Sequence, residues 1–216
     1  MKRFLKKPSG IAFVTCIVLF SLLAIWVSST PVPSCDEEIS SWISGADSSL
    51  FKWLMEAVSF LGEIPAATIM VVALVLVLLI YRRRLEALFV AILPLIGAVL
   101  NSDFKVLVDR PRPGDDPLGG GMSFPSGHTI FAVMLFGFLV IIAPKIIKSR
   151  RVTDIVQVLS LIFILLMGVS RVYLQAHWFS DTVGSLLLGG IILAPAFAIY
   201  DNYRGRRENT EVAGAA

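Results

Sequence analysis

Six apolar stretches run through the 216-residue chain, and they constrain its fold more than any other feature of the sequence. They are Ile11–Val27, Ile64–Tyr81, Leu85–Leu100, Thr129–Ala143, Ile155–Val169 and Val183–Tyr200. A membrane-spanning helix needs about 20 apolar residues, with a range of roughly 17 to 25. The third, fourth and fifth stretches are slightly short, and each adjoins polar residues. We therefore expect six spanning helices, three of which continue beyond the apolar layer into a polar pocket.

The composition supports a membrane protein over a soluble one. Hydrophobic residues make up 56% of the chain and charged residues 16%, whereas soluble domains have about 45–50% and about 25%. A water-soluble core of this size cannot bury such an excess. The two cysteines, Cys16 and Cys35, are too few for a disulfide-rich scaffold and poorly placed to pair. We expect an all-α, six-helix transmembrane bundle that forms a single domain over residues 1–216.

The N-terminal segment has a second interpretation. Lys2, Arg3, Lys6 and Lys7 precede the first apolar stretch, a pattern that is also typical of a signal peptide. However, the stretch is long for the core of a signal peptide, and the candidate cleavage site before Cys35 lies several polar residues beyond it. We therefore expect the first stretch to remain as a spanning helix.

The basic residues predict the orientation of the bundle. If the N-terminus is cytoplasmic and six spans follow, the cytoplasmic segments hold 14 of the 19 basic residues and the outer segments hold 11 of the 16 acidic residues. Short cytoplasmic loops are enriched in Lys and Arg. Both termini are therefore expected on the cytoplasmic side. The charge pattern indicates topology rather than binding of nucleic acid.

The segment between the first two spans, at about residues 36–62, has its own pattern. Its apolar residues recur at helical spacing, and Trp42 and Trp53 add aromatic rings. Aromatic, amphipathic helices commonly lie at the membrane surface. We predict an interfacial extracytoplasmic helical segment here; an ordinary packed helix is the alternative.

Three polar clusters interrupt the outer ends of the spans, and all three fall on the same side of the membrane in this topology. The first contains Lys105 and, seven positions later, Arg112-Pro113. The second is Pro125-Ser126-Gly127-His128, at the start of the fourth span. The third contains Ser170-Arg171, His177 and Asp181, between the fifth and sixth spans.

Each cluster has residue types that suit binding of a phosphate. The guanidinium groups of Arg112 and Arg171 match a phosphate bidentately, and Lys105 adds a mobile positive charge. Ser126 is a good N-cap, Gly127 allows a ligand to approach the backbone, and free amides at a helix N-terminus bind anions.

The histidines add reactivity to this binding chemistry. His177 and Asp181 are four residues apart and share a face of a helix. A carboxylate that holds one imidazole nitrogen leaves the other free as a nucleophile. Taken singly, each residue has a plainer role, such as a cationic side chain that reaches the headgroups or an Asp181–Arg171 ion pair. Their combination on one side of the membrane favours a catalytic site.

The ordered set Lys105-x6-Arg112-Pro113, Pro125-Ser126-Gly127-His128 and Ser170-Arg171-x5-His177-x3-Asp181 resembles the three-part signature of the type 2 phosphatidic acid phosphatase superfamily. No position of the signature, which spans residues 105–181, is substituted. The resemblance implies a membrane lipid phosphatase. It also implies three catalytic roles: His177 as the nucleophile, His128 as the general acid and base, and Asp181 as the residue that orients His177. Lys105, Arg112, Ser126, Gly127 and Arg171 would bind the phosphate. No metal or other cofactor is expected.

The sequence leaves the substrate open. We favour the phosphomonoester of phosphatidylglycerol phosphate, with phosphatidic acid as a further substrate, because Arg110 is the only spare outer cation near the three motif cations. The alternatives are an undecaprenyl-diphosphate phosphatase and, more remotely, a non-catalytic binder or transporter of anionic lipids. The glycine-rich segment 114–122 is either a mobile flap or a passive loop. The oligomeric state and the role of Cys35 are not predicted.

Overall fold

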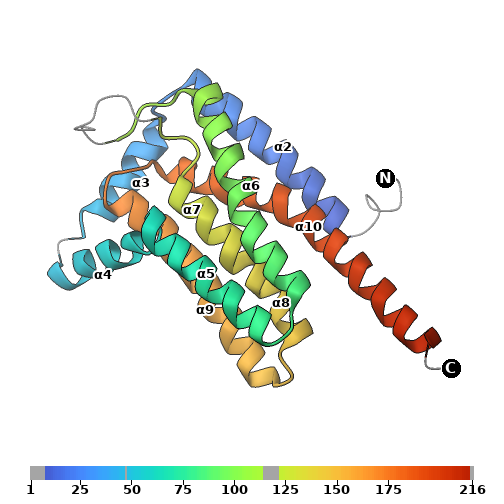
Figure 1. Ribbon diagram of the computed structural model, residues 1–216. Helices are drawn as coiled ribbons and strands as arrows, with labels where there is room; N and C mark the ends of the chain where they lie inside the picture. Colours follow the sequence, from blue (N-terminus) through green and yellow to red (C-terminus); the bar gives the residue numbers. More distant parts are fainter. Residues whose placement is uncertain (1–7, 47, 114–121, 215–216) are drawn as a thin grey trace.

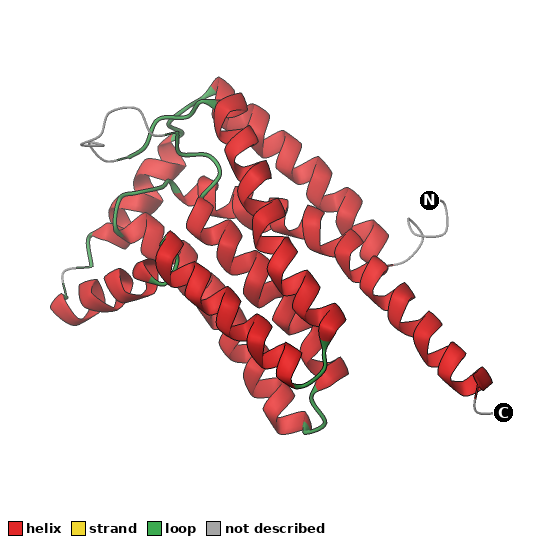
Figure 2. Ribbon diagram, in the orientation of Figure 1, coloured by secondary structure: helices red, strands yellow, loops and turns green. Residues whose placement is uncertain are grey.

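The computed structural model describes residues 8–46, 48–113 and 122–214, with side chains up to residue 206. All regular secondary structure in these residues is helical, which confirms the predicted fold class (Figures 1 and 2). The elements are α2 (Pro8–Ser29), α3 (Ser34–Ser44), α4 (Ser49–Phe60), α5 (Ile64–Ile80), α6 (Arg84–Val108), α7 (Gly127–Ala132), the π-helical turn η1 (Val133–Gly137), α8 (Phe138–Ile146), α9 (Arg150–Tyr173) and α10 (Phe179–Gly214).

Five described helical segments are individually long and apolar enough to cross a membrane: α2, α6, the continuous α7–η1–α8 segment, α9 and α10. The sixth candidate is α5 together with α4, which meet at a bend of 64°. The third, fourth and fifth spans extend past their apolar stretches, as predicted. Helix α6, for example, continues from Leu100 to Val108 and so carries Lys105 on its last turn.

The segment between the first two spans contains two helices rather than one continuous helix. Helix α3 ends at Ser44, and α4 begins at Ser49, where the Ser48 side chain accepts a hydrogen bond from the amide of Phe51. Helix α4 packs against α9 and buries Met55. Trp42 and Trp53 are exposed. Their contact with the membrane surface therefore stays a prediction.

The α7–η1–α8 segment is the most deeply buried span and packs against α6, α9 and α10. Close approach depends on small residues: a Cβ atom at position 189 would lie 2.2 Å from Cγ1 of Val133, and one at position 184 would lie 2.4 Å from Cε2 of Phe124. Gly184 and Gly189 of α10 therefore allow close packing within the chain. Cys16 and Cys35 are both free, as predicted.

The central segment begins at the site. Ser126 is the N-cap of α7, as predicted, and its hydroxyl accepts a hydrogen bond from the amide of Thr129 at 3.4 Å. Because α7 starts at Gly127, His128 lies in its first turn.

Candidate active site

The structure brings the three polar clusters together at one end of the bundle. The Ser185 hydroxyl of α10 donates to the carbonyl of Ser126 at 2.9 Å, which joins the second cluster to the helix of the third. The Trp178 indole donates to the carbonyl of Pro111 at 2.9 Å, which joins the third cluster to the first. Residues separated by up to 76 positions in the sequence, from Lys105 to Asp181, therefore share one site.

His177 and Asp181 are in contact, as their spacing predicts. Helix α9 ends at Tyr173, and the amides of residues 176 and 177 both donate to the carbonyl of Arg171, so the chain turns tightly into α10. His177 is 2% exposed, and its Nδ1 lies 3.3 Å from Oδ2 of Asp181. Burial lowers the pKa of His177 to about 4, although Asp181 opposes this shift. At neutral pH the imidazole is therefore uncharged, with Nδ1 held by the carboxylate.

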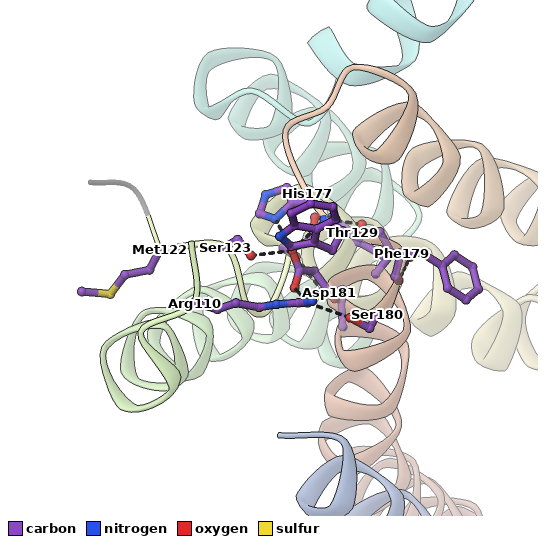
Figure 3. A network of polar contacts seen from close by, with 12 residues as sticks. Arg110, Met122, Ser123, Thr129, His177, Phe179, Ser180 and Asp181 are labelled. Atoms are coloured by element: carbon purple, nitrogen blue, oxygen red, sulfur yellow. Dashed lines mark hydrogen bonds and ion pairs between the residues drawn. The ribbon is translucent and has the colours of Figure 1, made fainter. Parts of the chain in front are cut away.

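The carboxylate of Asp181 is itself fixed by several donors (Figure 3). Its Oδ2 accepts hydrogen bonds from the Ser123 hydroxyl at 2.7 Å and from the Trp178 amide at 2.9 Å. Its Oδ1 pairs with a guanidinium nitrogen of Arg110 at 2.6 Å. Asp181 thus pairs with Arg110, and the alternative of an Asp181–Arg171 pair is not observed.

Arg110 corrects one sequence-based interpretation. The sequence suggests that Arg110 is a cation without a partner, but in the structure it is 1% exposed and its guanidinium group is bound to other residues. Besides Asp181, it pairs with Asp36 of α3 at 2.6 Å and donates to the hydroxyl of Ser180 at 2.7 Å and to the carbonyl of Pro31 at 2.7 Å. Asp36 also accepts the amide of Ser180 at 2.9 Å. The segment between the first two spans is therefore part of the support of His177.

The three motif cations lie within electrostatic range of one another. The ammonium group of Lys105 donates to the carbonyl of Met122, and Arg171 donates to the hydroxyl of Ser59 on α4. The Nε atoms of Arg112 and Arg171 are buried without a hydrogen-bond partner among the described residues. An unpaired buried N–H group costs about 1–3 kcal/mol, more when charged. An anion with several oxygens would satisfy both groups.

His128 lies close to Arg171 and Arg112 and also contacts a residue outside the motifs. Its Nε2 is 3.2 Å from Oε1 of Glu63, at the bend between α4 and α5. Sequence reasoning missed Glu63, just as it missed Asp36 and the role of Arg110. A contact between residues 65 positions apart on different elements has no local pattern by which it could be found.

An apolar cavity of about 460 Å³ begins at His128 and extends between α5 and α6. Its apolar lining comes from both helices and from the start of α7: Ile64, Ala67, Val71, Val72, Ala91, Pro94, Leu95, Ala98, Ile130 and Phe131. Its polar lining includes Glu63, which contacts His128, and Asn101, which lies beside Gly127. The site thus offers a cationic region and an apolar region that meet at one histidine.

Two other expectations concern the surroundings of the site. Apart from Met122, the segment 114–122 lies outside the described residues. In the part of the chain that the structure describes, there is no group of three or more His, Cys, Asp or Glu side chains placed to hold a metal ion.

Comparison with known proteins places this geometry in a family. The model of the PAP2 superfamily matches residues 86–204, which include all three clusters. The chain belongs to the PAP2 superfamily. It is 28% identical over 185 residues to phosphatidylglycerophosphatase B of Bacillus subtilis (strain 168), a match that covers 82% of this chain and 88% of that protein.

Two solved structures resemble the fold. The first transmembrane PAP2 type phosphatidylglycerolphosphate phosphatase from Bacillus subtilis superposes with a TM-score of 0.75 at 25% identity, over 88% of this chain and 96% of that one. LpxE of Aquifex aeolicus shares the fold with a TM-score of 0.59 at 20% identity, over 79% and 99% of the two chains. The protein is thus a multi-pass membrane phosphatase of the PAP2 superfamily, similar to phosphatidylglycerophosphatase B.

The buried Arg110 network yields a prediction about stability. Replacing Arg110 with Ala leaves Asp36 and Asp181 buried without their cation, and breaking a buried pair in this way costs about 3–5 kcal/mol. Thermal unfolding of the purified Arg110→Ala variant in detergent should show a clearly lower midpoint than wild type. Arg151→Ala, which removes an exposed cation from α9, is the matched control. Equal midpoints for Arg110→Ala and wild type would contradict the prediction.

Proposed function

We propose that this protein hydrolyses the phosphomonoester of phosphatidylglycerol phosphate at the extracytoplasmic face, through a phosphohistidine intermediate. One observation carries the proposal: a buried, neutral His177 held by Asp181 lies in the electrostatic field of Lys105 and Arg171. A non-catalytic lipid binder would need the cations but has no use for an oriented imidazole nucleophile.

In the first step, Nε2 of His177 attacks the phosphorus in line and forms a P–N bond as the P–O bond to the lipid breaks. His128 donates its proton to the departing lipid oxygen. In the second step, the now neutral His128 takes a proton from a water molecule, whose oxygen attacks the phosphorus and releases inorganic phosphate and neutral His177. Both histidines return to their starting protonation states.

Charge on the three equatorial phosphate oxygens develops during both steps, and stabilising it is the main task of such a site. Lys105, Arg112 and Arg171 supply the positive charge. The buried Nε atoms of Arg112 and Arg171, which have no hydrogen-bond partner in the part of the chain that the structure describes, support this role. Backbone amides near Gly127 and His128 supply further donors at the start of α7. The Ser126 hydroxyl, which caps α7, completes the set.

The apolar cavity supports a lipid as the substrate, with acyl chains between α5 and α6 and the headgroup at His128. The fixed position of Arg110 supports a phosphomonoester over a diphosphate. Because Arg110 is used by Asp36, Asp181 and neighbouring groups, it is not available to a second phosphate bonded directly to the first. This disfavours undecaprenyl diphosphate and favours phosphatidylglycerol phosphate, whose second phosphate is a diester one glycerol unit away, with phosphatidic acid as a further substrate.

We further propose that both termini are cytoplasmic and that the site faces outward. The turns after α5 and α8 lie at the end of the bundle opposite α3 and the site (Figure 1), and they contain the basic groups 82–84 and 148–151. Such clusters favour the cytoplasmic side. In this orientation Cys35 is external, so a membrane-impermeant maleimide should label it in intact cells. Labelling that requires permeabilised cells would refute the orientation.

Replacing His177 with Ala should abolish phosphate release, because it removes the proposed nucleophile. Among the described residues, no other imidazole contacts Asp181. Wild-type protein should form an acid-labile, alkali-stable phosphoenzyme with radiolabelled substrate, and the variant should not. Phe179→Ala, an exposed neighbour on α10, is the control.

Since protonation inactivates His177, the wild-type rate should fall as the pH drops through about 4. It should fall again at higher pH, when His128 loses its proton. A His177→Ala variant with near-normal turnover refutes the mechanism.

Activity should persist in EDTA, because the three cations supply the electrostatic stabilisation that a metal ion gives other phosphatases, and they would repel a divalent ion. Vanadate, which mimics phosphate, should inhibit competitively. Loss of phosphate release on chelation, followed by recovery with one specific metal, would decide against this mechanism.

The substrate is tested by comparing kcat/KM for phosphatidylglycerol phosphate, phosphatidic acid and undecaprenyl diphosphate in the same detergent. We expect the first to have the highest value: among the described residues, the site offers no further cation to a directly bonded second phosphate, which disfavours the diphosphate, and the similarity to phosphatidylglycerophosphatase B favours phosphatidylglycerol phosphate over phosphatidic acid. A clear preference for undecaprenyl diphosphate would overturn the substrate assignment but leave the histidine mechanism intact. Binding of all three lipids without release of phosphate would instead favour the lipid binder.

A further inference from the structure

The bend between α4 and α5, which we call the α4–α5 elbow (residues 59–63), touches the site although it lies outside all three motifs. The hydroxyl of Ser59 accepts a hydrogen bond from Arg171. A Cβ atom at position 62 would lie only 2.4 Å from Cδ2 of His128, so the imidazole ring packs directly on the backbone of Gly62. Glu63 then places a carboxylate oxygen 3.2 Å from Nε2 of His128.

The charges around His128 give this carboxylate a specific task. Arg171 of α9 and Arg112 of the loop after α6 lie within electrostatic range of His128, together with Glu63 of the elbow. Burial of the ring is the largest effect that disfavours the positive charge that His128 must have before it can donate a proton, and the two arginines, which are needed for the phosphate, add to it. Glu63 is the group among these three that favours the charged imidazole. The site therefore has an electrostatic conflict that Glu63 offsets.

We propose that Glu63 is a positioning residue that holds His128 in its protonated, proton-donating form. This role rests on the proposed function, in which His128 is the general acid. Glu63 and His128 both line the apolar cavity, at the end nearest the site, so the pair lies where the lipid oxygen departs. The Glu63 side chain is 54% exposed, so the fold does not depend on its burial.

The proposal predicts a difference between two kinetic parameters. The pH profile of kcat/KM reports the free enzyme, and that of kcat reports the enzyme–substrate complex. In the free enzyme, Glu63 is the one acidic group among the described residues that offsets the two arginines at His128. In the complex, the negative charge of the bound phosphate adds to that of Glu63. Loss of Glu63 should therefore affect the alkaline limb of kcat/KM more than that of kcat.

The test is Glu63→Gln, which keeps the shape of the side chain and removes its charge. Glu56→Gln, at an exposed position on α4, is the matched control. We expect the alkaline limb of kcat/KM for a lipid phosphate to move to lower pH by about one unit, a roughly tenfold loss above that limb, with activity recovered at lower pH. Thermal unfolding of both variants should match wild type.

A second substrate separates proton donation from general disruption of the site. A nitrophenyl phosphate with an attached alkyl chain has a leaving group that departs without a proton. Glu63→Gln should therefore lose much less activity on this compound than on the lipid phosphate.

Three results would overturn the role of Glu63: an unshifted alkaline limb, an equal loss on both substrates at every pH, or a rise in kcat/KM that marks Glu63 as an obstacle to substrate. If wild-type protein releases phosphate and Glu63→Gln behaves identically, only this inference fails. If wild-type protein releases no phosphate from any lipid, the proposed function fails, and the role of Glu63 fails with it.

Discussion

The ion pairs of Arg110 with Asp36 and Asp181 join parts of the chain that the helix bundle alone would leave independent. Asp36 belongs to α3, Arg110 follows α6, and Asp181 begins α10. All three side chains are at most 1% exposed, so each charge requires its partner. The same carboxylate that pairs with Arg110 also holds His177. The orientation of His177, the proposed nucleophile, is thus coupled to the packing of α3 against the rest of the protein.

A second electrostatic constraint acts on the other side of the site. Three cations placed close together are unfavourable unless an anion or a carboxylate lies among them. Asp181 is used by Arg110 and His177, and Glu63 contacts His128. Two guanidinium nitrogens therefore stay buried without partners among the described residues. In the proposed function, the substrate's phosphate resolves this imbalance.

Most of the fold could be predicted from the sequence because its signals are local. Apolar stretches, the Ser126 cap and the i, i+4 spacing of His177 and Asp181 each depend on a few neighbouring residues, and the structure contains all of them. Contacts between distant residues could not be predicted. Arg110 looked like a spare cation because one partner, Asp36, lies 74 residues away. The contact of Glu63 with His128 depends on the 64° bend between α4 and α5, which hydropathy does not encode.

The position of His128 explains how one site can serve a substrate with two incompatible halves. The cavity between α5 and α6 is lined by His128 but by none of Lys105, Arg112, Arg171 and His177. The lipid part of a substrate bound in that cavity and a phosphate at the cations would therefore meet at His128. In the proposed function, the P–O bond that joins the phosphate to the lipid is the one that hydrolysis breaks, and its oxygen is the atom that needs a proton. His128, the proposed general acid, thus marks the boundary between the apolar and the cationic parts of the site, so the lipid chains would not have to leave an apolar environment for the phosphate to react.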